Sequence, residues 1–160
     1  VYVAVMMSFI YQIRELQNGG EFVVLLFLAA WGNDTLAYCT GMLIGKHKMS
    51  PILSPKKSIE GLVGGIVGAA ILGALYGLYL NTYIRFSFNP VTMFPIVCGL
   101  GGAVSVIGDL AASAIKRDSG IKDYGTLIPG HGGILDRFDS IIFIAPVIYY
   151  LTVMISGGAI

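Results

Sequence analysis

Long apolar runs separated by short polar connections dominate this chain. Four runs are long enough, or nearly so, to cross a bilayer as helices, which takes about 20 predominantly apolar residues. These runs cover residues 22–45, 61–83, 91–115 and 140–156, and a shorter apolar run covers residues 1–13. The pattern predicts an all-α fold, in which a polytopic bundle of transmembrane helices forms a single membrane-embedded region over residues 1–160.

Composition agrees with a membrane location. Hydrophobic residues make up 56% of the 160 residues and charged residues 12%, whereas soluble domains carry about 25% charged residues. Cys39 and Cys98 both lie within apolar runs without a CxxC pairing, so we interpret them as buried thiols. The sequence starts at Val1 inside an apolar run with no basic segment before it, which argues against a signal peptide. We therefore expect a fragment that enters partway through a helix and lacks N-terminal helices.

Positive charge is distributed unevenly between the connections. Eight of the ten lysine and arginine residues lie in residues 46–60 and 116–139, while Arg14 and Arg85 lie in the alternate connections. By the positive-inside rule, the two basic connections face the cytoplasm. We therefore expect a polar cavity that opens to the cytoplasm. The formal net charge of +1 by itself says nothing about nucleic acid, because the distribution of charge matters more than its sum. We expect no nucleic-acid partner.

Small residues recur at every fourth position of the run 61–83. They are Gly61, Gly65, Ala69, Gly73 and Gly77. Such a stripe lets helix backbones approach closely in lipid. We interpret it as a packing surface rather than as a binding site.

Two acids lie inside apolar runs, where a central aspartate costs about 2.5–3.5 kcal/mol on insertion scales. Asp109 shares one helical face with Ser113, Lys116 and Arg117, which lie 4, 7 and 8 positions further on. This polar stripe favours a functional role for Asp109 over a plain ion pair with Lys116. For Asp34, a structural hydrogen-bonded acid and a site residue remain equally open.

A glycine-rich segment precedes the last apolar run. Gly130, Gly132 and Gly133 surround His131 there, with Lys122 and Arg137 on either side. Glycine permits close backbone approach, and N–H groups at a helix start bind phosphate oxygens. The glycines alone could equally form a turn. The flanking cations make phosphate binding the better interpretation.

Asp136 and Asp139 lie three residues apart at the start of the last run, so they are neighbours on the first turn of a helix. Acids there can stabilise the helix dipole. They can also bind a hard cation such as Mg²⁺ together with substrate phosphates. The spacing alone leaves both interpretations open.

Motifs in the two basic connections resemble those of one enzyme family. Residues 113–139 read S-x-x-K-R, then K-D, then P-x-H-G-G-x-x-D-R-x-D, and residues 54–61 read SPKKSIEG. These strings resemble the C-terminal catalytic part of the phosphatidate cytidylyltransferase (CDP-diacylglycerol synthase) family. The resemblance implies a nucleotidyltransferase that converts CTP and phosphatidate to CDP-diacylglycerol and pyrophosphate. It also implies a homodimer, contact with membrane lipids, and a bacterial cytoplasmic membrane with the active site facing the cytoplasm.

The resemblance implies roles for individual residues as well. Mg²⁺ would be bound by Asp109 and Asp136, with Asp139 as a further candidate, while the identity of any second cation stays open. Residues assigned to catalysis are Lys116, Arg117, Lys122, Arg137 and His131. Residues assigned to substrate binding are Ser113, Lys56, Lys57, Gly132, Gly133 and Asp123. We expect His131 to orient or donate to phosphate rather than act as a base, because a phosphate monoester is already mostly dianionic at neutral pH.

Two alternatives are weighed against this interpretation. A related CTP-dependent enzyme would act on an ether lipid or a polyprenol. An ion-coupled transporter could also place Asp34 and Asp109 in the membrane. The sequence has no evident inverted repeat, and its phosphate-binding segments are confined to one side, which disfavours the transporter.

Overall fold

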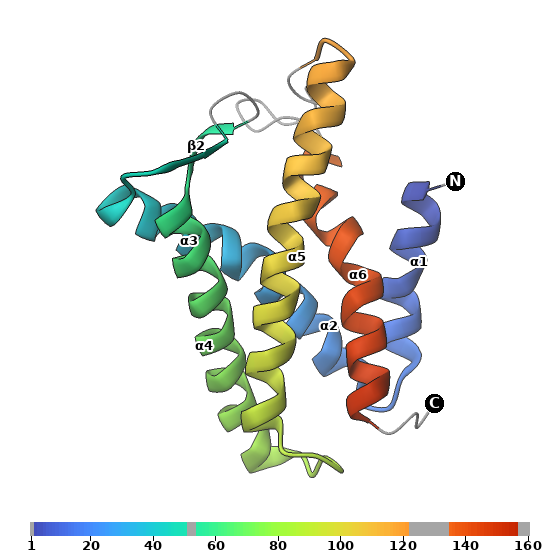
Figure 1. Ribbon diagram of the computed structural model, residues 1–160. Helices are drawn as coiled ribbons and strands as arrows, with labels where there is room; N and C mark the ends of the chain where they lie inside the picture. The colour runs from blue at the N-terminus through green and yellow to red at the C-terminus, as the bar shows by residue number, and fades with distance from the viewer. Residues whose placement is uncertain (1, 51–53, 122–134, 157–160) are drawn as a thin grey trace.

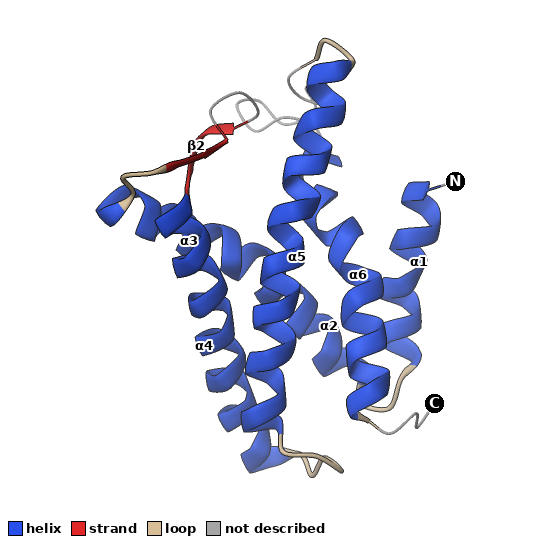
Figure 2. Ribbon diagram, in the orientation of Figure 1, coloured by secondary structure: helices blue, strands red, loops and turns tan. Residues whose placement is uncertain are grey.

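The computed structural model describes residues 2–50, 54–121 and 135–156. Nearly all of these residues are helical, as Figure 2 shows. In chain order the elements are α1 (Tyr2–Glu15), α2 (Gly19–Phe27), the π-helical turn η1 (Leu28–Gly32), α3 (Asn33–Ile44), β1 (Lys48–Ser50), β2 (Ser54–Ser58), α4 (Ile59–Tyr83), α5 (Pro90–Asp118) and α6 (Leu135–Ile155). The predicted all-α class is confirmed.

Four helical segments among the described residues are long and apolar enough to cross a membrane. They are Gly19–Ile44, Ile59–Tyr83, Pro90–Asp118 and Phe138–Ile155. The outward face of α4 exposes Val63, Val67, Ile71 and Leu75, each more than half exposed. Exposed aliphatic side chains in such a row match a surface that faces lipid. The chain is an integral membrane protein.

The small-residue stripe of α4 is a packing surface, as predicted. Its five members are buried. A Cβ atom on Gly73 would lie 2.6 Å from the carbonyl oxygen of Phe94, and one on Gly77 would lie 2.6 Å from that of Pro90. Both positions therefore require glycine for α4 and α5 to pack as the long antiparallel pair visible in Figure 1.

Three local features differ from what the apolar pattern indicates. The connection after α3 contains an antiparallel hairpin, in which Lys48 pairs with Ser58. The helix α5 continues to Asp118, beyond the apolar run 91–115, and so includes Lys116 and Arg117 as their helical spacing from Asp109 predicted. The segment 19–44 is interrupted by η1 immediately before Asn33 and Asp34. π-Helical turns often occur at functional sites.

The hairpin and the 84–89 connection lie at opposite ends of the α4–α5 pair (Figure 1). The end with the 84–89 connection is filled by aromatic rings, among them Phe22, Phe86 and Phe94, whose centroids lie 5.7–6.5 Å apart. The hairpin end instead carries the charged side chains of β2, α5 and the start of α6. The polar chemistry of the described residues is therefore concentrated at that end.

Candidate active site

A cavity of about 580 Å³ lies beneath the hairpin, between α3, α4 and α5. Its charged lining comes from Asp34, Lys48, Lys57 and Asp109. The remaining lining is small or apolar, and includes Gly41 and Gly61, which lie where α3 and α4 cross closely. The cavity therefore combines an apolar wall with a few convergent charges, as binding sites for small molecules do.

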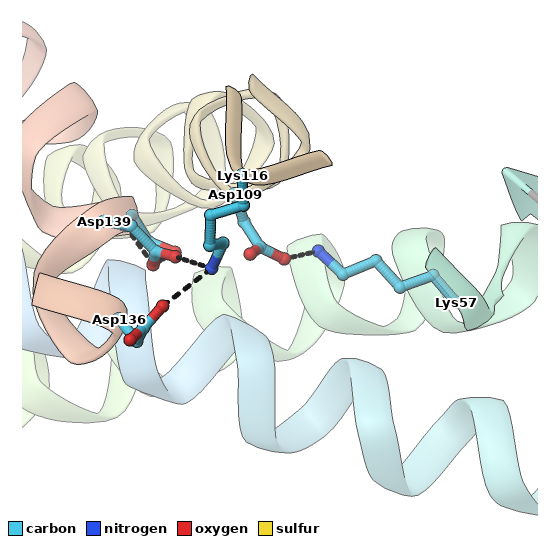
Figure 3. Close-up of polar contacts among 6 residues, drawn as sticks. Lys57, Asp109, Lys116, Asp136 and Asp139 are labelled. Carbon is cyan, nitrogen blue, oxygen red and sulfur yellow. Dashed lines mark hydrogen bonds and ion pairs between the residues drawn. The ribbon is translucent and has the colours of Figure 1, made fainter. Parts of the chain in front are cut away.

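Lys57 connects the hairpin to the middle of the site. Its ammonium group donates a hydrogen bond to the Asp109 carboxylate, as Figure 3 shows. The two side chains are 28% and 26% exposed, so both remain accessible from the cavity. Asp109 is therefore paired with a lysine of the other basic motif, so this contact joins the two motifs.

A second ion-paired group lies where α5 meets the first turn of α6. Lys116 Nζ lies 2.9 Å from Asp136 Oδ1 and 3.5 Å from Asp139 Oδ2. All three side chains are at most 10% exposed. Asp139 also accepts a hydrogen bond from the Ser140 backbone N–H, at 2.7 Å. The two acids predicted to be neighbours on one turn thus share a buried lysine (Figure 3).

Asp34 lies between the two groups. It lines the 580 Å³ cavity together with Lys57 and Asp109, and it also lines a cavity of about 360 Å³ together with Asp136 and Asp139. Its carboxylate accepts a 3.5 Å hydrogen bond from the side-chain amide of Asn33. The sequence left the role of Asp34 open, and the structure places its side chain beside both ion-paired groups.

The remaining predicted residues are spread around this centre. Ser113 is partly buried on α5, and Arg117 is exposed near the end of that helix. The backbones of Lys56 and Arg137 lie on β2 and on the first turn of α6. Five predicted residues lie outside the described residues: Lys122, Asp123, His131, Gly132 and Gly133.

Sequence reasoning missed the structural connection made by Glu60. The sequence assigned it no contact, yet its carboxylate contacts Lys46 and His47 at the base of the hairpin. The only signal in the sequence was its place within the SPKKSIEG string. Nothing in the spacing indicated which segment it would contact.

The acids of the site suit Mg²⁺ by their donor chemistry. Mg²⁺ prefers oxygen ligands and is often held by one or two carboxylates plus waters and substrate phosphates. Asp109 and Asp136 offer such carboxylates, and each already has a lysine ammonium group beside it. In the part of the chain that the structure describes, no three acid, histidine or cysteine side chains are close enough to form a complete metal site. Substrate phosphates and water would have to supply the remaining ligands.

Comparison with known proteins identifies the family of this membrane bundle. The model of the cytidylyltransferase family matches residues 1–155. The phosphatidate cytidylyltransferase of Staphylococcus saprophyticus is 37% identical over 154 residues, which is 96% of this chain and 56% of that protein. The enzyme of the same name from Staphylococcus aureus strain COL is 39% identical over 152 residues, or 95% of this chain and 56% of that protein.

The chain belongs to the cytidylyltransferase family. The family predicted from the two basic motifs is therefore confirmed. The chain spans about half the length of the relatives it matches.

Proposed function

We propose that the gene product carrying residues 1–160 transfers a cytidylyl group from CTP to phosphatidate, giving CDP-diacylglycerol and pyrophosphate. The observation that carries the proposal is the meeting of two lysines with four acids at one end of a membrane bundle of this family. One substrate would be a membrane lipid and the other a soluble nucleotide. A charged site at the end of the bundle suits such a pair.

The chemistry requires charge neutralisation more than a base. The phosphate of phosphatidate is a monoester with a second pKa near 6, so it is mostly dianionic at neutral pH. One of its oxygens would form a bond to the α-phosphorus of CTP, while the bond from that phosphorus to the bridging oxygen breaks and pyrophosphate leaves. The principal obstacle is repulsion between two polyanions, which lysine side chains reduce.

Individual residues have separate roles in this proposal. Lys57 and Lys116 would bind phosphate oxygens, with Arg117, Lys122 and Arg137 adding positive charge. Asp109 and Asp136 would hold Mg²⁺, with Asp139 as a further candidate. The ion would supply neutralisation of negative charge on phosphate oxygens.

The remaining predicted site residues would contact the substrates. Ser113, Lys56, Asp123 and the amides of Gly132 and Gly133 would bind substrate. His131 would orient or donate to a phosphate.

Activity of the purified gene product tests the proposal. Reconstituted with phosphatidate and CTP, we expect it to release pyrophosphate and form CDP-diacylglycerol only when Mg²⁺ is present. Pyrophosphate release that requires an ether-lipid phosphate instead would identify a related cytidylyltransferase. Formation of CDP from CTP and a polyprenol would identify a kinase. Substrate-driven ion uptake without pyrophosphate release would identify a transporter.

We further propose a bacterial cytoplasmic membrane as the location, with the hairpin end facing the cytoplasm. The uneven distribution of the ten cations supports this orientation. The homodimer implied by the family resemblance is also retained as a proposal. The α4 glycine stripe would not form its interface, because those glycines pack against α3 and α5 of the same chain.

Labelling of single cysteines tests the orientation. In a background with Cys39→Ser and Cys98→Ala, we expect a cysteine at position 118 to react with an impermeant maleimide only in opened cells. A cysteine at position 87, an exposed residue of the 84–89 connection, should react in intact cells. Labelling of position 118 from outside intact cells would contradict the proposed orientation.

A further inference from the structure

Glu60, on the first turn of α4, ties together the two ends of the hairpin. Its carboxylate accepts hydrogen bonds from the backbone N–H of Lys46 at 3.1 Å and from that of His47 at 3.2 Å. The His47 ring nitrogen Nδ1 lies 2.6 Å from the same carboxylate. One side chain thus contacts three polar groups in the segment that follows α3.

The same segments are also joined through their backbones. The Ile59 N–H donates to the His47 carbonyl at 3.0 Å, and Lys48 pairs with Ser58 across the hairpin. The Ser58 hydroxyl caps α4 by accepting from the Gly61 N–H at 3.1 Å. Glu60 therefore lies at the base of the hairpin, where hydrogen bonds hold the start of β1 and the end of β2 together.

Lys57 lies three residues before Glu60, where β2 runs into α4. To reach Asp109, its side chain must cross from the hairpin to α5. Among the described residues, β2 contacts few elements besides β1, α3 and α4, and the hairpin begins in exposed residues from Gly45 to Lys48. The direction in which Lys57 leaves the hairpin is therefore set at the hairpin base.

We propose that Glu60 is a positioning residue, which holds the hairpin base so that Lys57 reaches Asp109 and the substrate phosphates. This inference rests on the proposed cytidylyl transfer. An acid that only stabilised the helix dipole would need no contact with Lys46 or His47. The three contacts to Lys46 and His47 indicate that Glu60 also orients the hairpin.

Steady-state kinetics of the gene product test whether Glu60 acts through Lys57. Loss of a group that orients a ligand typically costs about 10–100-fold in activity, so we expect Glu60→Ala to lower kcat/KM for CTP by about that factor. Glu60→Gln keeps an acceptor oxygen and should recover part of the loss. Because Glu60 acts through Lys57, Glu60→Ala should add little to the defect of Lys57→Ala. Glu15→Ala, which removes an exposed acid of α1, is the matched control and should stay near wild type.

A cross-linking measurement tests the same inference without relying on catalysis. With cysteines at positions 57 and 109 in the Cys39→Ser, Cys98→Ala background, a short bis-maleimide should join the two positions efficiently. Glu60→Ala should lower the cross-link yield severalfold, while a monofunctional maleimide still labels both cysteines.

The outcomes separate the inference from the proposed function. If Glu60→Ala lowers cross-linking but the gene product with Lys57 and Asp109 intact shows no cytidylyl transfer, the positioning role is upheld and the proposed reaction is rejected. Unchanged cross-linking would overturn the positioning role. So would a double variant whose loss of kcat/KM equals the product of the losses of Glu60→Ala and Lys57→Ala.

Discussion

Asp109→Asn is expected to lower kcat for cytidylyl transfer by at least about a hundredfold. A bound metal contributes several kcal/mol to such a reaction, and each 1.36 kcal/mol corresponds to tenfold in rate. The substitution preserves size but removes the negative charge that would hold Mg²⁺ and that pairs with Lys57. Single-turnover assays over a range of Mg²⁺ concentrations measure the effect. If excess Mg²⁺ partly restores the rate, the defect lies in metal binding.

Asp118→Asn is the matched control. Asp118 is an exposed acid at the end of the same helix, nine residues beyond Asp109, and it has no proposed role. Its substitution should leave kcat near that of the wild type. If Asp109→Asn is equally harmless, Asp109 is only a structural partner of Lys57, and the metal assignment fails.

Asp34→Asn distinguishes the two roles left open for that residue. Asp34 lines both cavities and therefore lies near both ion-paired groups. A structural acid would affect stability more than turnover, whereas a site residue would change turnover at unchanged stability. The comparison with Asp109→Asn shows which description fits.

The helices could be predicted from the sequence because lipid imposes a direct requirement on composition. A segment of about 20 apolar residues has few stable alternatives to a membrane helix, since its backbone groups must be satisfied internally. The packing role of the α4 glycine stripe could also be predicted, because close helix packing leaves no room for a side chain at Gly73 or Gly77.

The hairpin and the π-helical turn could not be predicted in the same way. Strands as short as Lys48–Ser50 have no independent stability, and they depend here on contacts made by Glu60 and Ser58. The π-helical turn lies within a continuous apolar run, where the hydrophobic pattern is the same for either kind of helix.

The sequence named candidate site residues but not the contacts between them. Helical spacing correctly placed Asp136 beside Asp139, because neighbours on one turn follow from local geometry. The partners of the lysines depend on tertiary packing. Lys57 and Asp109 are 52 positions apart, and Lys116 pairs with Asp136 at the start of α6. No spacing rule encodes such contacts.

Lys116→Met is expected to reduce stability as well as activity. Removing one partner of a buried ion pair costs about 3–5 kcal/mol, because the remaining charge is left uncompensated. Here two carboxylates, of Asp136 and Asp139, would lose a shared lysine while their side chains stay at most 10% exposed. Thermal unfolding in detergent should therefore occur at a clearly lower temperature, and cytidylyl transfer should be lost.

Arg117→Met separates the two effects. Arg117 follows Lys116 directly but is exposed, so its loss removes a cation from the proposed phosphate-binding group without uncovering a buried acid. We expect Arg117→Met to impair transfer at nearly unchanged unfolding temperature. Equal unfolding temperatures for the two variants would contradict the buried ion-paired group. A stable Lys116→Met protein with normal turnover would remove Lys116 from the proposed mechanism, because neither its charge nor its contacts would then be required.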